Sequence, residues 1–125
     1  MLSVLKLNNN ALIELPDAIG ALSNLKILYL DNNQISSIPE SIGYLNQLEE
    51  LMISDNDIES LPDNIVNLSS LIKLRLDENQ LVDLPVDIAV IGNMSALEEL
   101  WLNGNQIVSL PDSLFATDEF GETNL

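Results

Sequence analysis

A sequence period of 23 residues constrains this chain more than any other feature. Pro16, Pro39, Pro62 and Pro85 are each 23 residues apart, and Pro111 follows after 26. A fixed period in this range is typical of solenoids, in which each unit is one supersecondary element that buries its apolar face only against its neighbours. The chain of 125 residues is therefore predicted to be a single repeat domain. Its five units are expected at about 2–24, 25–47, 48–70, 71–96 and 97–119.

The common pattern of the units reads LxxLxLxxNxLxxLPxxIGxLxx, and its third copy is LEELMISDNDIESLPDNIVNLSS. In LxxLxL the last two apolar residues are two apart, which is the spacing of residues on one face of a strand. Leu28 and Leu30 should therefore point inward and Tyr29 outward. Because one such strand cannot bury its apolar face alone, we expect the units to stack in parallel at about 4.8 Å and to form a continuous sheet.

An asparagine follows each predicted strand, and a proline follows each asparagine by six residues. The asparagine amide can pair backbone groups that the turn leaves unpaired, so we expect a ladder of hydrogen bonds through the stack. This ladder consists of Asn10, Asn33, Asn56, Asn79 and Asn105. Proline fixes φ and lacks a donor, which leaves room only for a short turn or 3₁₀ segment on the opposite side of the solenoid.

The amino-acid composition argues against several classes of functional site and partner. The chain has no cysteine and no histidine, which excludes disulfides, the usual zinc sites and a Ser-His-Asp triad. Twenty acidic residues against four basic ones give a net charge of −16, which argues against nucleic acid as a partner. No segment is apolar enough for membrane insertion, and the start MLSVLKLNNN lacks the features of a signal peptide. We therefore expect a cytoplasmic protein without metal or cofactor.

The recurring LxxLxLxxN and LPxxIGxL segments resemble the leucine-rich repeat family, in the 23-residue form of intracellular Ras-group and scaffold proteins. The resemblance implies an α/β, right-handed superhelical solenoid with a concave parallel sheet and convex short turns. It also implies a non-enzymatic module that binds a protein partner in signalling, such as a small GTPase or a phosphatase. Two alternatives stay open: the recognition part of a larger kinase or ubiquitin ligase, and an extracellular receptor domain.

By the same resemblance, the outward strand residues line the concave surface and are the candidate binding residues. The central row is Lys6, Tyr29, Met52, Arg75 and Trp101. The other candidates around it are Lys26, Ile27, Asp31, Glu50, Lys73, Asp77 and Glu99.

All four basic residues of the chain fall on this surface, and Trp, Tyr and Arg dominate the energetics of protein interfaces. The acidic surroundings favour a basic partner. Lateral pairing is an equally simple explanation of the cations, because Lys73 lies between Glu50 and Glu99 in its row and Arg75 can stack on Trp101.

Two regions depart from the pattern. The fourth unit carries three extra residues, so either Ile88 or Ile91 can take the core position of the isoleucine in LPxxIGxL. We favour Ile91, because IGNMSALEEL matches IGYLNQLEEL of the second and third units, and this alignment places the insertion near 86–90. After the fifth unit, residues 120–125 read either as a closing half-repeat or as a partial sixth unit of a longer array, and we favour the longer array.

Overall fold

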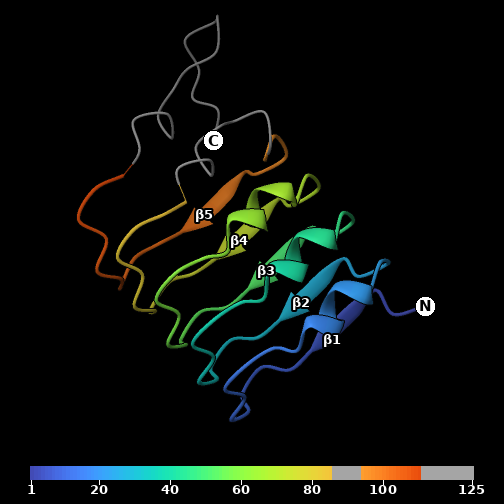
Figure 1. The fold of residues 1–125 in the computed structure, drawn as a ribbon, viewed down its shortest axis with the longest axis horizontal. Coiled ribbons are helices and arrows are strands. Elements are labelled where there is room, and N and C mark those ends of the chain that lie inside the picture. The colour runs from blue at the N-terminus through green and yellow to red at the C-terminus, as the bar shows by residue number, and fades with distance from the viewer. Residues whose placement is uncertain (86–93, 111–125) are drawn as a thin grey trace, which may run out of the picture.

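The protein is a stack of five short parallel strands, as seen in a computed structural model that describes residues 1–85 and 94–110 (Figure 1). The strands follow one another in the sheet in the order of the sequence. They are β1 (Val4–Lys6), β2 (Ile27–Tyr29), β3 (Glu50–Met52), β4 (Lys73–Arg75) and β5 (Glu99–Trp101). Equivalent residues pair across each neighbouring strand, for example Leu28 with Leu51 and Leu51 with Leu74, so the register follows the repeat.

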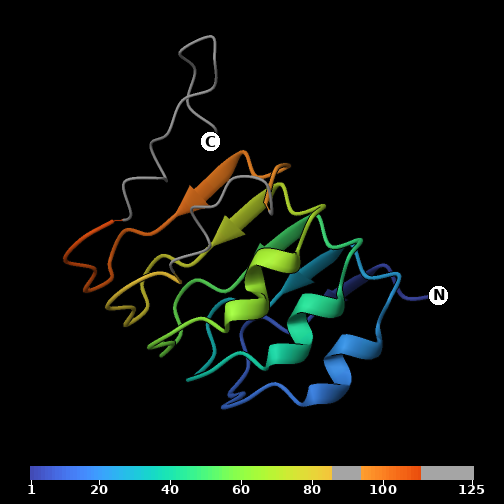
Figure 2. The ribbon, with the colours of Figure 1, turned by 45° about the horizontal axis from the view of Figure 1, so that its top comes forward.

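Short 3₁₀ helices form the side opposite the sheet, where they stack on one another (Figure 2). They are η1 (Asp17–Ala21), η2 (Glu40–Tyr44) and η3 (Asp63–Asn67). Each begins directly after the repeat proline, whose φ lies between −72° and −65° and prepares the chain for a helical turn. Each also carries an acidic residue in its first turn, which suits the positive end of the helix dipole. The predicted solenoid with a parallel sheet and short turns opposite it is confirmed.

The core lies between the sheet and the 3₁₀ helices and is almost entirely aliphatic. In the middle units most of the predicted inward positions have no exposed surface, namely Leu28, Leu30, Ile35, Ile42, Leu51, Ile53, Ile58, Ile65, Leu74, Leu76 and Leu81. The same positions are only partly buried in the first unit, at Leu5, Leu7 and Leu12. Each inner rung is covered on both sides by its neighbours, so truncation of one of these leucines to alanine should cost about 2–5 kcal/mol.

The predicted asparagine ladder is present at Asn33, Asn56, Asn79 and Asn105, whereas among the described residues Asn10 in the first unit donates only to carbonyls of its own unit. Asn56 accepts the Ile35 N–H through Oδ1 at 3.0 Å, and its Nδ2 donates to the carbonyl of Leu30 at 3.0 Å and of Ser54 at 3.0 Å. Equivalent bonds link Asn33, Asn79 and Asn105 to the unit before each of them. Each amide thus closes its own turn and clamps the preceding unit.

The residue before each ladder asparagine has a left-handed backbone, which the repeat pattern did not predict. Asn9, Asn32, Asp55, Glu78 and Gly104 have φ between 53° and 71°. Four of these five are the residue types that tolerate this conformation best. Glu78 is the exception. The carboxylate of Glu78 lies so close to Gly104 that a Cβ at position 104 would overlap it.

The fourth unit is again in register at Met94. This residue is 4% exposed, and its carbonyl accepts the Leu97 N–H at 3.1 Å, as the carbonyl of Leu45 accepts the Leu48 N–H at 3.0 Å. The choice between Ile88 and Ile91, the insertion near 86–90 and the partial unit at 120–125 lie outside the described residues.

Candidate functional site

The exposed face of the sheet, called the concave face below, carries nine of the twelve predicted binding residues in two rows. The other three lie beside the strands: Lys26 directly before β2, and Asp31 and Asp77 two residues after β2 and β4. Strand register aligns Lys6, Tyr29, Met52, Arg75 and Trp101 in the central row. It aligns Val4, Ile27, Glu50, Lys73 and Glu99 in the neighbouring row. The predicted alignment is confirmed, and the binding role of these residues stays a prediction.

The side chains of the central row differ in how far they project. Trp101 is 44% exposed, Tyr29 and Arg75 are half-buried, and Met52 is only 9% exposed. Met52 is therefore part of the floor between Tyr29 and Arg75, and it does not project as an anchor. Exposed apolar surface on the concave face is concentrated at Val4 and Ile72 in addition to Trp101.

Each of the four cations is engaged by a neighbour within the solenoid. Lys26 Nζ lies 3.1 Å from Glu49 Oε1, and Lys73 Nζ lies 3.6 Å from Glu99 Oε2. Lys6 Nζ sits 5.5 Å from the centre of the Tyr29 ring. Of the two carboxylates that the sequence offered Lys73, only Glu99 is within ion-pair distance among the described residues. Lateral pairing thus accounts for the cations, and their gathering on one face does not by itself indicate a bound partner.

Arg75 is the most firmly held of the cations. Its Nε donates to Asp77 Oδ1 at 3.1 Å and its Nη2 to Asp77 Oδ2 at 2.8 Å, while its guanidinium carbon lies 4.7 Å from the centre of the Trp101 ring. The Ser54 hydroxyl also donates to Asp77 Oδ1 at 2.9 Å. This bidentate, stacked arrangement fixes both Arg75 and the Trp101 ring in one geometry.

The electrostatics of this pair follow from its contacts. Burial pushes the pKa of Asp77 upward, but hydrogen bonds from Arg75 and Ser54, together with the charge of Arg75, outweigh that effect and lower the pKa below its ordinary value. The hydrogen bond to Asp77 raises the pKa of Arg75. Both groups therefore stay charged at neutral pH, and their charges cancel locally.

The concave face consequently presents a surplus of negative charge. Three carboxylates, of Glu49, Asp77 and Glu99, are matched by cations. Within residues 1–85 and 94–110 no ion pair neutralises the remaining carboxylates of this face, which are Asp31, Glu50, Asp55, Glu78 and Glu98. No group of three or more acidic side chains in the same residues is placed to share a metal ion.

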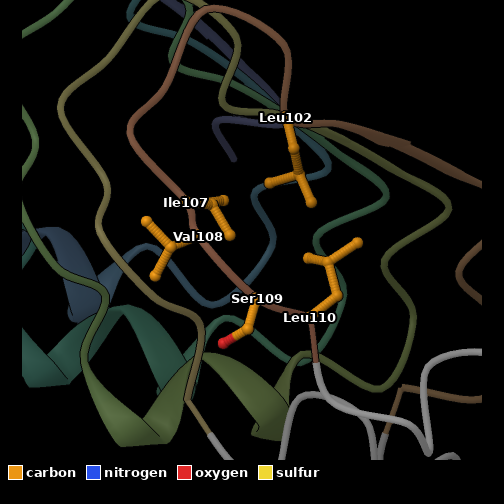
Figure 3. A pocket seen from close by; sticks show the side chains of 5 residues that line it. All are labelled: Leu102, Ile107, Val108, Ser109 and Leu110. Carbon is orange, nitrogen blue, oxygen red and sulfur yellow. The ribbon is translucent and has the colours of Figure 1, made fainter.

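An apolar hollow of about 500 Å³ lies at the fifth unit, away from the concave rows (Figure 3). It is lined by Leu102, Ile107, Val108, Ser109 and Leu110, and Figure 3 shows the side chains of Leu102 and Leu110 pointing toward each other. Leu102, Ile107 and Leu110 occupy rung positions that are buried in the middle units. The hollow is therefore the open side of the last described rung, and Ser109 carries the one polar side chain among its lining residues. No helix in the described part of the chain is long and apolar enough to cross a bilayer.

Comparisons with known proteins agree with this architecture. The family profile described as a leucine-rich repeat region matches residues 1–114. No curated protein sequence matches the chain. Among solved structures, a leucine-rich repeat protein of Leptospira interrogans is 35% identical with a TM-score of 0.85, over 91% of this chain and 28% of that one.

Two other solved structures show how widely the architecture is used. An internalin of Listeria monocytogenes is 34% identical with a TM-score of 0.72, over 86% of this chain and 30% of that one. The plant peptide hormone receptor RGFR1, solved in complex with RGF2, is 30% identical with a TM-score of 0.76, over 85% of this chain and 17% of that one. The chain thus spans less than a third of the length of each of these proteins.

Proposed function

The chain belongs to the leucine-rich repeat family, whose domains generally bind proteins, and we propose that it docks a basic protein segment on its concave face. The observation that supports this proposal is the charge arrangement of that face. Three of its four cations are already ion-paired within the solenoid and Lys6 lies over the Tyr29 ring, so the net charge left for a partner is negative. Such a field speeds the encounter with a basic surface and disfavours an acidic one.

The concave face also offers aromatic side chains for apolar contacts with a partner, in addition to its charged residues. Trp101 is held in place by Arg75, and Tyr29 lies under Lys6, so both rings are ordered before a partner arrives. Binding to a preformed surface loses little side-chain entropy. Tyr29 and Trp101 are the proposed anchors, with Met52 as the floor between them.

An intracellular signalling scaffold is the setting we favour. Support comes from the LPxxIGxL sequence, which resembles that of Ras-group proteins, and it makes a small GTPase or a phosphatase a reasonable partner class. A non-enzymatic role is part of the proposal, because the concave rows contain no nucleophile and base in contact. The alternative is a recognition segment of a larger receptor or enzyme, which the short span relative to the matched structures favours.

The test neutralises equal charge on two faces of the molecule. One variant carries Glu50→Gln, Asp55→Asn and Glu98→Gln on the concave face. The matched control carries three substitutions in the exposed first turns of η1, η2 and η3, namely Asp17→Asn, Glu40→Gln and Asp63→Asn. Proteins captured from a cell extract on the immobilised chain are compared at low and at high salt.

We expect the concave variant to lose its captured partner and the salt dependence of capture, while the control keeps both. A parallel variant, Tyr29→Ala with Trp101→Ala, should lose the same partner although circular dichroism shows an intact fold. If the concave variant and the control lose the captured partner equally, capture depends only on the net charge of the chain, and the concave face is not the docking site. Unchanged capture by the Tyr29 and Trp101 variant would remove the concave anchors from the proposal.

A further inference from the structure

Asn103 and Gly104 form the one Asn–Gly pair in the sequence, and they lie in the turn that follows β5. Both residues are exposed, and Gly104 has the left-handed φ of 71°. Asparagine is a thermolabile residue because the backbone nitrogen of the residue that follows it can attack its side-chain amide. Glycine on the C-terminal side removes the Cβ that would hinder this attack.

Position in the stack decides whether the attacking nitrogen is accessible. In the first four units the N–H of the left-handed residue donates to a carbonyl of the next unit. These bonds are Asn9 to Asp31 at 2.9 Å, Asn32 to Ser54 at 3.0 Å, Asp55 to Asp77 at 3.1 Å and Glu78 to Asn103 at 2.8 Å. Gly104 belongs to the fifth unit, and across the two described segments of the chain its N–H has no such acceptor. The Asn103 amide has no hydrogen-bond partner in the same segments.

We propose that Asn103 is a site of spontaneous deamidation in the folded protein. Solvent base removes the proton of the Gly104 N–H, and the nitrogen attacks Cγ of Asn103. A new N–Cγ bond forms, the bond from Cγ to the amide nitrogen breaks, and this nitrogen leaves as ammonia. Water then opens the succinimide ring at either carbonyl, which gives aspartate or isoaspartate, and no oxidant or reductant takes part. The reaction is favoured because nucleophile and target are already neighbours in one chain.

The two products should differ in their effect on the repeat. Aspartate at position 103 matches Asp31 and Asp77, which occupy this position in other units, and adds one negative charge beside Glu78. Isoaspartate at position 103 lengthens the main chain by one carbon between residues 103 and 104. The change falls at the carbonyl of residue 103, which accepts the Glu78 N–H. The first product therefore preserves the turn, and the second loosens it.

The test uses the first unit as a matched control. The substitution Asn9→Gly places a glycine directly after Asn8 and so creates a second Asn–Gly pair, at a left-handed φ of 59° that glycine accepts. There the attacking N–H is held by the carbonyl of Asp31. The folded Asn9→Gly protein is incubated in mildly alkaline buffer, and peptide mapping by mass spectrometry measures aspartate and isoaspartate at positions 8 and 103.

We expect deamidation at Asn103 to be about tenfold faster or more than at Asn8, because only the latter must first break a hydrogen bond. In denaturant the two rates should converge. Equal or slower reaction at Asn103 in the folded protein overturns the proposal. Wild-type protein gives an independent measurement: a native rate at Asn103 far below its rate in denaturant would also overturn it.

Discussion

Replacement of Asn56 by alanine tests the energetic role of the asparagine ladder. The Ile35 N–H, on a fully buried residue, would lose its acceptor, and an orphaned buried donor costs about 1–3 kcal/mol. The carbonyls that receive the Asn56 amide keep other donors. The Leu30 carbonyl, for example, also accepts Asn33 Nδ2 at 2.9 Å. Loss of those additional bonds adds about 1 kcal/mol, so the free energy of unfolding should fall by about 2–4 kcal/mol.

Asn10→Ala is the matched control, because the same residue type occupies the same position in the first unit. Its Nδ2 donates to the Leu7 carbonyl at 2.9 Å, but that carbonyl also accepts Asn33 Nδ2 at 3.0 Å. Within the described residues its Oδ1 accepts no hydrogen bond, so no buried donor is orphaned by the substitution. We expect a loss below about 1 kcal/mol for Asn10→Ala.

Urea unfolding measures the difference, with far-UV circular dichroism for the whole stack and fluorescence of Trp101 for β5. Repeat proteins do not always unfold in one step, so the two transitions must coincide before the free energies are compared. Similar losses in Asn56→Ala and Asn10→Ala would refute the reasoning, because they would show that the amide acts within its own turn and does not clamp the preceding unit.

Three further predictions concern single positions. Gly43→Ala should lower the free energy of unfolding by about 2 kcal/mol or more in urea titrations, because its Cβ would lie 2.7 Å from the backbone oxygen of Asn64. Glu78→Asn should raise it by about 0.5–1 kcal/mol, since asparagine tolerates a φ of 54° better than glutamate does. Arg75→Met should destabilise the protein at neutral pH, because the ionised Asp77 loses its partner. The pKa of Asp77 is lowered in the folded protein, so its ionised form stabilises the fold above the ordinary aspartate pKa, and this contribution is lost on acidification. The difference in stability between Arg75→Met and wild type should therefore shrink below about pH 4. A pH-independent difference in unfolding curves would contradict the last one.

The periodic features of the fold were predictable because each one recurs in nearly the same environment in every unit. Two leucines that are two residues apart indicate a strand only weakly. The same spacing at the same position in five consecutive units indicates a strand in every unit. The strand rows, the asparagine ladder and the turns after Pro16, Pro39 and Pro62 follow from this repetition. Packing between identical neighbours multiplies local signals that would be ambiguous in an irregular domain.

Partner choice within the concave face was not predictable to the same extent. The sequence placed Arg75 on this face but offered it several carboxylates, and it is Asp77, two residues along on the same face, that binds it with two hydrogen bonds. Lys73 likewise had two flanking glutamates, and its ion pair is with Glu99. Such choices depend on rotamers and on distances of about one ångström, which a repeat pattern does not encode.

Packing between the 3₁₀ turns explains one part of the repeat pattern, the glycine that follows isoleucine in the first two units. A Cβ on Gly20 would lie 2.6 Å from the Ser41 backbone oxygen, and Gly43 is equally confined, so adjacent turns approach as closely as glycine permits. The third unit has Val66 at this position, and its side chain is buried. The first two units therefore have glycine where adjacent turns meet, and the third unit has a buried valine at the same position. The repeat pattern shows only that glycine recurs after isoleucine, whereas the packing of η1 on η2 and of η2 on η3 gives the physical reason for it.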